Sequence, residues 1–256
     1  MTPDQRGFST LLKKEIMRFW AVLAQTVTAP VITALLYLLV FAQALQGRTV
    51  NGYEGLSYTE FLVPGLVMMT VIQNAFANTS SSLIQSKVMG NIVFTLMAPL
   101  GPLDWFGAYV IAALVRSVLV ALAMLAVTWF FVPLPLHAPA ALLAVFTLSA
   151  ATLAALGLIA GILAQKFDHI AAFTNFFITP LSFLSGVFYS VHSLPPFWFT
   201  ASHFNPFFYM IDGFRYGFFG QADVPIFQSL LWIAGAFVAV SSVALWMLVT
   251  GYKMRR

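Results

Sequence analysis

The sequence predicts an all-α polytopic membrane protein, and two features of its composition carry that prediction. Of the 256 residues, 61% are hydrophobic and only 8% are charged, whereas an ordinary soluble domain is about 25% charged. The mean hydropathy of +0.90 is too high for a soluble core of this size to hide. High hydrophobicity excludes a disordered chain, and the absence of cysteine excludes a disulfide scaffold. We expect a single transmembrane domain over residues 1–256.

The first segment, residues 2–20, lacks the continuous apolar core of a signal peptide. Its apolar side chains recur at helical spacing, and its basic side chains fall on other faces. The apolar positions are Phe8, Leu12, Ile16 and Phe19, and the basic positions are Lys13, Lys14 and Arg18. This pattern predicts an amphipathic helix lying along the inner membrane surface. The alternative is a solvated tail before the first span.

Long uncharged stretches mark the membrane spans, because a transmembrane helix needs about 20 mostly apolar residues. The longest such stretch has 49 residues and therefore holds the end of one helix and the whole of the next. Pro30 is expected to shorten or bend the first span, and Pro180 the fifth. The six predicted spans are 22–45, 61–84, 107–131, 141–165, 170–190 and 227–250.

Lysine and arginine residues predict the orientation of these spans, because positive charge is retained in the cytoplasm. Nine basic residues fall on one side: Arg6, Lys13, Lys14, Arg18, Lys87, Lys166, Lys253, Arg255 and Arg256. The opposite loops hold only Arg48 and Arg215, and Arg116 lies within the third span. Both termini are therefore expected in the cytoplasm. Because the basic residues are scattered among loops, no nucleic-acid surface is expected.

The segment between the second and third spans, 86–100, is too short to cross a membrane and too apolar for a solvated loop. Apolar residues recur on one helical face, and Pro99 and Pro102 end the helix. Such a helix favours docking on a partner protein, and the alternative is an extension of the neighbouring spans that packs on itself. The positions expected on this face are Val88, Ile92, Thr95 and Leu96.

The last external connection, 190–226, is 37 residues long, and 11 of its first 31 residues are aromatic. Aromatic rings favour the membrane interface. Pro195-Pro196 and Asn205-Pro206 divide the segment into short helices. The pattern predicts a helical hairpin that dips part-way into the outer leaflet, where protein shields its backbone. The alternative is a cap that lies flat at the interface.

Motif searches give no sign of catalysis by this chain. The sequence contains no G-x-x-x-x-G-K-[ST], G-x-G-x-x-G or H-E-x-x-H pattern, and its four histidines lack metal-ligand spacing. Ser185 with His192 or His203 would suit an intramembrane serine protease. However, both histidines fall outside the predicted span, and a nucleophile needs its base within hydrogen-bonding distance. We therefore expect no catalytic residue and no bound metal.

Charges at membrane depth are few and mark candidate functional positions. Arg116 could line a translocation path or, as we favour, hold a neighbouring helix by bonding its carbonyls. Asp212 and Arg215 are three residues apart on a helix and can form an ion pair, for which we favour a structural role over substrate binding. No acidic residue lies inside any predicted span and no inverted repeat is visible, so the energy for transport must come from elsewhere.

Residues 179–220 contain a Ser-Gly, a Leu-Pro, an Asn-Pro and a closing arginine, here Ser185-Gly186, Leu194-Pro195, Asn205-Pro206 and Arg215. The stretch 61–69 and the pair Ala98-Pro99 extend the pattern. In these features the chain resembles the membrane subunit of type 2 ABC transporters, the exporter permeases of bacterial drug, lipid or polysaccharide transport. The likeness covers nearly the whole chain and is strongest to small inner-membrane transport permeases of Gram-negative bacteria.

The resemblance implies a multi-pass protein of the bacterial inner membrane that works as a homodimer among membrane lipids. Two separate ATP-binding-cassette ATPase subunits would bind it and carry ATP and Mg, so this chain needs no cofactor. The resemblance makes 86–100 the coupling helix, 2–20 the connecting helix and 190–226 a re-entrant pair. The residues expected to meet the ATPase are Val88, Asn91, Ile92, Thr95, Leu96 and Pro99. Relatives often have acidic residues in the coupling helix, whereas 91–96 has none.

The mechanism expected from this resemblance is alternating access at a dimer interface, with ATPase closure pushing on 86–100. Four aromatic residues of the fifth span could line a path for a lipid-like or glycan cargo, although packing and lipid contact are the commoner roles. These residues are Phe173, Phe176, Phe177 and Phe183. Ser185 and Gly186 are grouped with them as path or structural positions. The alternative function is an ATP-independent secondary transporter or channel with six helices.

Overall fold

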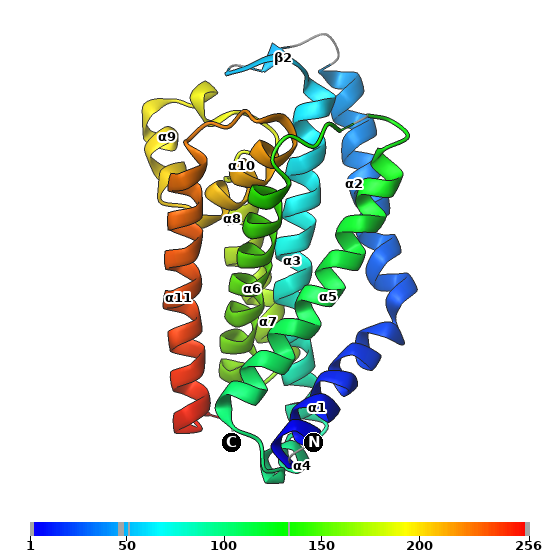
Figure 1. Ribbon diagram of the computed structural model, residues 1–256, viewed down its shortest axis with the longest axis vertical. Helices are drawn as coiled ribbons and strands as arrows, with labels where there is room; N and C mark the ends of the chain where they lie inside the picture. The colour runs from blue at the N-terminus through cyan, green and yellow to red at the C-terminus, as the bar shows by residue number, and fades with distance from the viewer. Residues whose placement is uncertain (1–2, 46–48, 51, 133, 254–256) are drawn as a thin grey trace.

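The computed structural model describes residues 3–45, 49–50, 52–132 and 134–253, and it is an elongated bundle of helices with a two-stranded hairpin at one end (Figure 1). Within those ranges, five helices are long and apolar enough to cross a membrane. They are α2 (Leu23–Ala44), α3 (Tyr58–Val88), α5 (Pro102–Thr128), α6 (Pro139–Leu163) and α11 (Ile226–Thr250). They correspond to the first, second, third, fourth and sixth predicted spans.

Helix caps set boundaries that the apolar windows did not show. The Ser57 hydroxyl accepts a hydrogen bond from the Glu60 N–H at 3.2 Å, and the Glu60 carboxylate accepts one from the Ser57 N–H at 2.7 Å. This capping box starts α3 three residues before the predicted span. The carboxylate of Asp104 likewise accepts from the Gly101 N–H at 2.9 Å, which starts α5 at Pro102.

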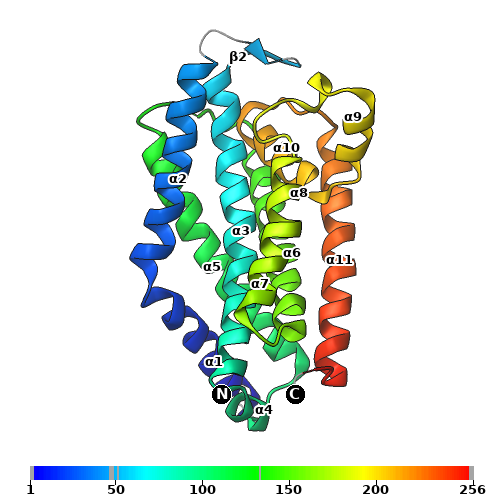
Figure 2. The same cartoon turned by 180° about the vertical axis from the view of Figure 1, so that it is seen from behind.

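The predicted fifth span, 170–190, is a shorter and broken helix. It consists of α7 (Phe167–Phe173), a π-helical turn η1 (Thr174–Ile178) and α8 (Thr179–Phe183). The wide turn directly precedes Pro180, whose ring would meet a carbonyl four residues earlier in a regular α-helix. The helix ends at Phe183, and the chain turns at Gly186, whose φ of +75° suits glycine. The segment rises from the end near α4 toward α10 (Figure 2).

The predicted hairpin is divided where the prolines indicate. A 3-10 turn, η2 (Val191–Ser193), precedes α9 (Pro196–His203) and α10 (Pro206–Phe219). The aromatic rings serve two purposes, which the sequence analysis did not separate. Phe197 on α9 is 73% exposed, whereas Phe208 and Phe214 on α10 are each 1% exposed and belong to the main core.

A small antiparallel hairpin, β1 (Thr49–Val50) and β2 (Tyr53–Ser57), joins α2 to α3 and was not predicted. The all-α prediction therefore holds for the bundle but misses these strands. The signal was present, because Asn51-Gly52 is a favoured hairpin dipeptide. Asn51 itself lies outside the described residues, and Gly52 has a φ of +85°.

Helix α3 is the centre of the bundle, with 83% of its most apolar window buried, against 11% for α2 and 22% for α11. It meets α6 closely at Gly157, where an added Cβ would lie 2.1 Å from the Thr79 hydroxyl oxygen and 2.5 Å from the Phe76 carbonyl oxygen. The Thr79 hydroxyl also donates to the Ala154 carbonyl at 2.8 Å. Small residues at such contacts let helix backbones approach in a membrane.

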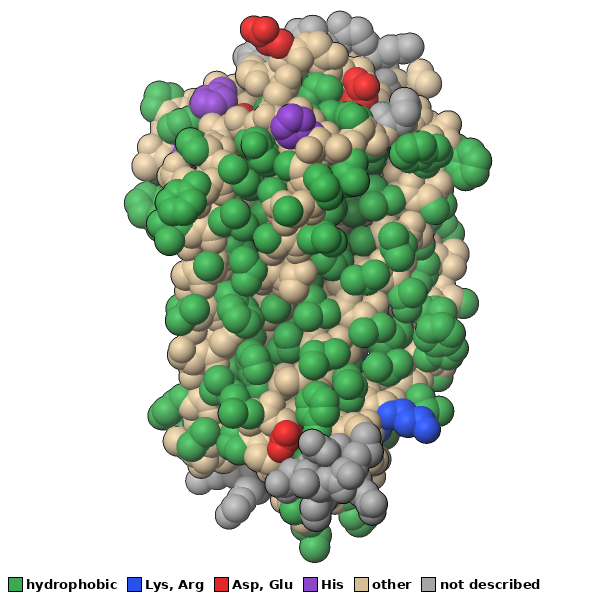
Figure 3. All heavy atoms as spheres, viewed as in Figure 1, with side chains coloured by type: hydrophobic (Ala, Val, Ile, Leu, Met, Phe, Trp, Pro, Cys, Tyr) green, Lys and Arg blue, Asp and Glu red, His purple; other side chains and the backbone are tan. Residues whose placement is uncertain are grey.

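Helices α1 (Pro3–Trp20) and α4 (Ile92–Met97) lie together with the last turn of α11 at one end of the bundle, which we call the α4 end (Figure 1). The hairpin end is opposite. On the face in Figure 3, hydrophobic side chains cover the middle of the molecule and charged ones appear toward its ends. This is the distribution of a membrane protein.

The N-terminal helix forms as predicted, but its buried face differs from the predicted one. Leu11, Glu15 and Phe19 are 4%, 0% and 0% exposed, and they follow one another at a spacing of four residues. Arg18 was placed on the solvated face, yet its side chain points into the bundle, because it binds Asn78 on α3. The side chain of Arg6, like residues Arg48, Arg255 and Arg256, lies outside the described part of the chain.

Candidate functional site

An apolar surface covers α4 and the turn before it, and we call it the α4 surface. Its most exposed members are Phe94 and Met97, at 76% and 79%. The full set is Val88, Met89, Val93, Phe94, Leu96 and Met97. Gly90, with a φ of +74°, separates the end of α3 from α4. So much exposed apolar surface on a short helix is typical of an interaction site.

The six residues predicted to meet the ATPase differ in their exposure. Val88, Asn91, Leu96 and Pro99 are exposed and Thr95 is half-buried. Ile92 is 6% exposed and packs in an inner cluster with Trp105, so it is not on the face where the sequence analysis placed it. The reason is that 86–100 is not one helix, because the turn at Gly90 breaks the register between Val88 and Ile92.

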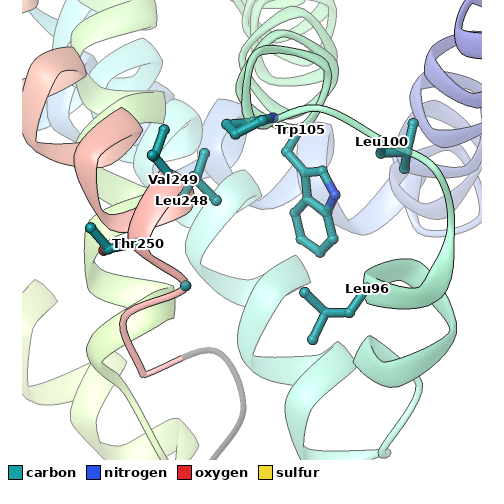
Figure 4. Close-up of a pocket in the computed structure, with 8 residues that line it drawn as sticks. Leu96, Leu100, Trp105, Leu248, Val249 and Thr250 are labelled. Carbon is teal, nitrogen blue, oxygen red and sulfur yellow. The ribbon is translucent and has the colours of Figure 1, made fainter.

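A cavity of about 310 Å³ lies beside α4, between the start of α5 and the last turn of α11. Figure 4 shows Leu96, Leu100 and Trp105 on one side and Leu248, Val249 and Thr250 on the other. Leu96 belongs to both the cavity and the α4 surface. The end of α11 therefore lies next to the predicted docking region, which no sequence pattern indicated.

Arg116 lies near the middle of α5 and is 8% exposed. One guanidinium nitrogen, Nη2, donates to the Asn74 side-chain oxygen at 2.9 Å, and Nη1 donates to the Asn78 side-chain oxygen at 3.3 Å. Its Nε has no hydrogen-bond partner among the described residues. Arg116 therefore bonds side-chain amides of α3, whereas backbone carbonyls of a neighbouring helix were expected.

A second arginine reaches the same amide from α1. Nη2 of Arg18 donates to the Asn78 side-chain oxygen at 3.1 Å and to the Asn78 backbone carbonyl at 2.8 Å. Its Nε lies 3.3 Å from the Glu15 carboxylate, which also accepts from the Ser82 hydroxyl at 2.6 Å. We call Glu15, Arg18, Asn74, Asn78, Ser82 and Arg116 the Arg116 cluster. Glu15 could have been found from its spacing of four residues to Leu11 and Phe19.

Arg215, on α10, is 1% exposed and has a partner for each nitrogen. Nε donates to the Phe61 carbonyl at 3.3 Å, Nη1 to the Tyr53 hydroxyl at 3.4 Å, and Nη2 to the Gly186 carbonyl at 2.9 Å. The guanidinium also lies 3.8 Å from the centre of the Phe61 ring. This one side chain therefore joins β2, α3, α10 and the turn after α8.

The predicted pair between Asp212 and Arg215 forms, with Nη1 and Oδ1 3.9 Å apart. The Asp212 carboxylate also accepts from the Tyr53 hydroxyl at 2.9 Å and from the Asp223 and Val224 N–H groups at 2.8 and 3.2 Å. Tyr53, Asp212, Arg215 and Asp223 make up the Arg215 cluster. Tyr53 and Asp223 were missed, because they are far in sequence from the loop that carries the pair.

Three donors surround the Asp212 carboxylate, namely the Tyr53 hydroxyl and the N–H groups of Asp223 and Val224. Burial raises the pKa of Tyr53 above its ordinary value, so the hydroxyl keeps its proton and donates it to Asp212.

The remaining motif residues shape the chain around these clusters. The Ser185 hydroxyl donates to the Ser182 carbonyl, and neither His192 nor His203 is its hydrogen-bond partner, so no nucleophile is assembled there. The Asn205 side chain caps α10 by accepting from the Phe207 N–H at 3.0 Å, with Pro206 in the first helical turn. Leu194 is half-buried and Pro195 precedes α9.

Of the four phenylalanines predicted as candidates for a path, one packs inside the bundle and three are exposed. Phe173 stacks on Phe76 of α3, with ring centres 5.4 Å apart, and so packs inside the bundle. Phe176, Phe177 and Phe183 are 75%, 55% and 40% exposed. They lie on the broken helix, where the π-turn redirects side chains.

Comparison with known proteins agrees with this architecture. The model of the ABC-2 type transporter family matches residues 6–219. The inner membrane transport permease YadH of Escherichia coli K12 is 41% identical over 220 residues, covering 86% of each chain. Nodulation protein J of Sinorhizobium fredii NGR234 is 28% identical over 183 residues, covering 66% of this chain and 65% of that protein. Nodulation protein J of Rhizobium leguminosarum bv. trifolii is 28% identical over 196 residues, 71% of this chain.

The family model spans most of the bundle, from α1 to the end of α10, and the alignment with the permease relative has a similar length. The apolar helices and this match agree on a membrane permease without ATPase function of its own. The chain therefore belongs to the ABC-2 type transporter family and is a multi-pass transport permease of a bacterial inner membrane.

Proposed function

We propose that this chain lines the translocation path of an ATP-driven exporter, as a homodimer bound to two ATP-binding-cassette ATPase subunits that carry ATP and Mg. The α4 surface supports the proposal most directly, because it is an exposed apolar patch on a helix outside the five spans. Membership of the family implies an ATPase partner. This surface is the part of the chain best suited to meet that partner.

The proposed topology has six crossings, with the α4 end in the cytoplasm. Lysines gather toward this end: Lys13 and Lys14 lie on α1, Lys87 at the end of α3, and Lys253 after α11. Retention of positive charge in the cytoplasm supports this orientation. In this orientation, the broken helix from α7 to α8 is the fifth crossing. Helices α9 and α10 are then a re-entrant pair in the outer half of the bundle.

The face offered for the second copy is formed by α2 and the broken helix. Helix α2 is largely unburied in the single chain. Phe176 and Phe177, which lie in the proposed fifth crossing, are also exposed. Phe188, after α8, packs against Phe41 of α2 with ring centres 4.9 Å apart, so the two segments adjoin. A cargo that moves between two such faces would be amphipathic, lipid-like or glycan-type.

The test is assembly with the ATPase. We expect Phe94→Asp and Met97→Asp to abolish co-purification with the ATPase and stimulated ATP hydrolysis, while membrane insertion stays normal. Phe130→Asp is the matched control, because Phe130 is 87% exposed and follows the far end of α5. Normal ATPase binding by both α4 variants would reject the docking surface. Uphill transport by the chain alone, without nucleotide, would favour the secondary-transporter alternative.

A further inference from the structure

A crevice of about 250 Å³ lies between α2 and α3. Apolar residues make up half of its lining, and the other half has polar groups: Thr33 and Tyr37 on α2, and Thr70, Gln73 and Asn74 on α3. Gln73 stands halfway along the 31-residue α3, so the crevice is deep in the apolar middle of the bundle. One of its walls, α2, is only 11% buried.

Two polar groups in this crevice lack partners in the described part of the chain. The Gln73 amide and the Tyr37 hydroxyl make no hydrogen bond there, whereas the Thr33 and Thr70 hydroxyls each donate to a backbone carbonyl of their own helix. An unsatisfied polar group at membrane depth is costly and usually marks a ligand or ion path. The crevice therefore presents free hydrogen-bond donors to an incoming group.

Arg116 lies directly behind the crevice wall. Its Nη2 binds the side-chain oxygen of Asn74, a residue that lines the crevice. Across the described residues, no carboxylate lies within ion-pair distance of Arg116. Glu15, the acidic member of the Arg116 cluster, pairs with Lys14 and Arg18. The positive charge of Arg116 is therefore not balanced by the protein, and its field acts on any group that enters beside Asn74.

We propose that this crevice binds the acidic headgroup, a phosphate or carboxylate, of an amphiphilic cargo. The Gln73 amide and the Tyr37 hydroxyl donate to the headgroup oxygens, and Arg116 acts through Asn74 as an electrostatic positioning residue. The volume suits a headgroup and excludes a whole lipid, because sites for drug-sized ligands measure roughly 300–1,000 Å³. The acyl chains then lie along the apolar surface of α2 and α3.

This assignment of cargo rests on the proposed export function, but binding to the purified chain needs no ATPase. The probe is dioctanoyl phosphatidate, added to the full chain in neutral detergent and followed by native mass spectrometry. Dioctanoyl phosphatidylcholine and dioctanoylglycerol test the acidic group, and glycerol 3-phosphate tests the head without chains. We expect phosphatidate to bind at least about tenfold more tightly than the other three.

Three variants locate the site. Gln73→Leu removes the amide without breaking a hydrogen bond among the described residues, and we expect it to weaken phosphatidate binding about tenfold. Arg116→Gln is expected to reduce the preference for phosphatidate over phosphatidylcholine. The matched control is Gln43→Leu, on an exposed glutamine of α2 outside the crevice, and it should bind as the wild type does.

The outcomes separate the possibilities. Unchanged phosphatidate affinity in Gln73→Leu, or equal wild-type affinity for phosphatidate and phosphatidylcholine, would overturn the proposal. Binding of glycerol 3-phosphate as tight as that of phosphatidate would replace the amphiphile by a free phosphate compound and overturn the assignment of cargo. Because none of these measurements includes the ATPase, loss of headgroup binding is distinguishable from failure of assembly at α4.

Discussion

Arg116 and Arg215 are both buried in the same bundle, yet their partners differ in kind. Arg215 has a carbonyl, a hydroxyl or an aromatic face on every side and a carboxylate, Asp212, beside it. Arg116 has two neutral amide oxygens and an Nε without a partner among the described residues. A fully satisfied buried charge stabilises one structure, whereas an incompletely satisfied one keeps a preference for a ligand.

The largest expected difference between the two arginines is in stability. Arg215→Gln leaves Asp212 buried without its counter-charge, which costs about 3–5 kcal/mol and lowers the melting temperature by roughly 10 °C. Arg116→Gln loses hydrogen bonds but also removes a buried charge that has no carboxylate partner among the described residues, so the net cost should be less than about 1 kcal/mol. Thermal unfolding of both variants in detergent measures the contrast. Equal melting temperatures would show that the two clusters do not differ as proposed.

The contact between α3 and α6 bears on both clusters, because α3 contributes the Phe61 carbonyl that Arg215 binds and the Asn74 and Asn78 side chains that Arg116 binds. In Gly157→Ala, the new Cβ would meet Thr79 and the Phe76 carbonyl, so we expect a loss of about 1–3 kcal/mol from overpacking. Gly235→Ala is the control, since apart from its own stretch of helix no atom of the described residues lies within 4 Å of its Cβ position. That variant should unfold at or slightly above the wild-type temperature, because alanine favours helix more than glycine does.

The stability effects of two tyrosines extend the comparison: Tyr53 belongs to the Arg215 cluster, and Tyr37 lines the crevice beside Asn74. Tyr53→Phe removes the hydroxyl that donates to Asp212 and accepts from Arg215, and the unpaired groups cost about 1–2 kcal/mol. Tyr37→Phe removes a hydroxyl without a described partner, so its melting temperature should match the wild type. If Tyr37→Phe were the more destabilised of the two, the hydroxyl in the crevice would have a structural role that its surroundings do not show.

The sequence was informative where the signal is local. The uncharged stretches located five long helices, the prolines of Pro195-Pro196 and Asn205-Pro206 located α9 and α10, and a spacing of three residues located the Asp212–Arg215 pair. These features depend on residues that are close in the chain. Their physical basis is the cost of unpaired backbone in lipid and the missing N–H of proline.

The sequence was less informative where partners come from distant segments or where one glycine changes the register. Tyr53 and Asp212 are 159 residues apart, and no pattern links them. The turn at Gly90 places Ile92 in the core, and the helix that corresponds to the predicted fifth span ends at Phe183, before Gly186. Arg18 was used for the topology and placed away from the apolar face of the N-terminal helix, and its contact with Asn78, 60 residues later, has no signal in the sequence.

The smallest effect is expected from supplying the charge that the Arg116 cluster lacks. The Asn78 side-chain oxygen accepts from both Arg18 and Arg116, and its Nδ2 is buried without a partner in the described residues. Asn78→Asp replaces that unpaired donor by a carboxylate oxygen between two guanidinium groups. We expect a gain of about 1 kcal/mol in stability, because charge-assisted hydrogen bonds are stronger than neutral ones.

The same substitution should weaken binding of dioctanoyl phosphatidate, since Arg116 would no longer carry an unbalanced charge. Melting temperature and native mass spectrometry on one preparation measure both effects. A variant that is more stable and binds less phosphatidate is the result expected if stability and ligand binding compete for the same cation. A variant that gains stability but keeps full affinity would show that the charge of Arg116 does not reach the crevice, and the difference between the two arginines would then be structural alone.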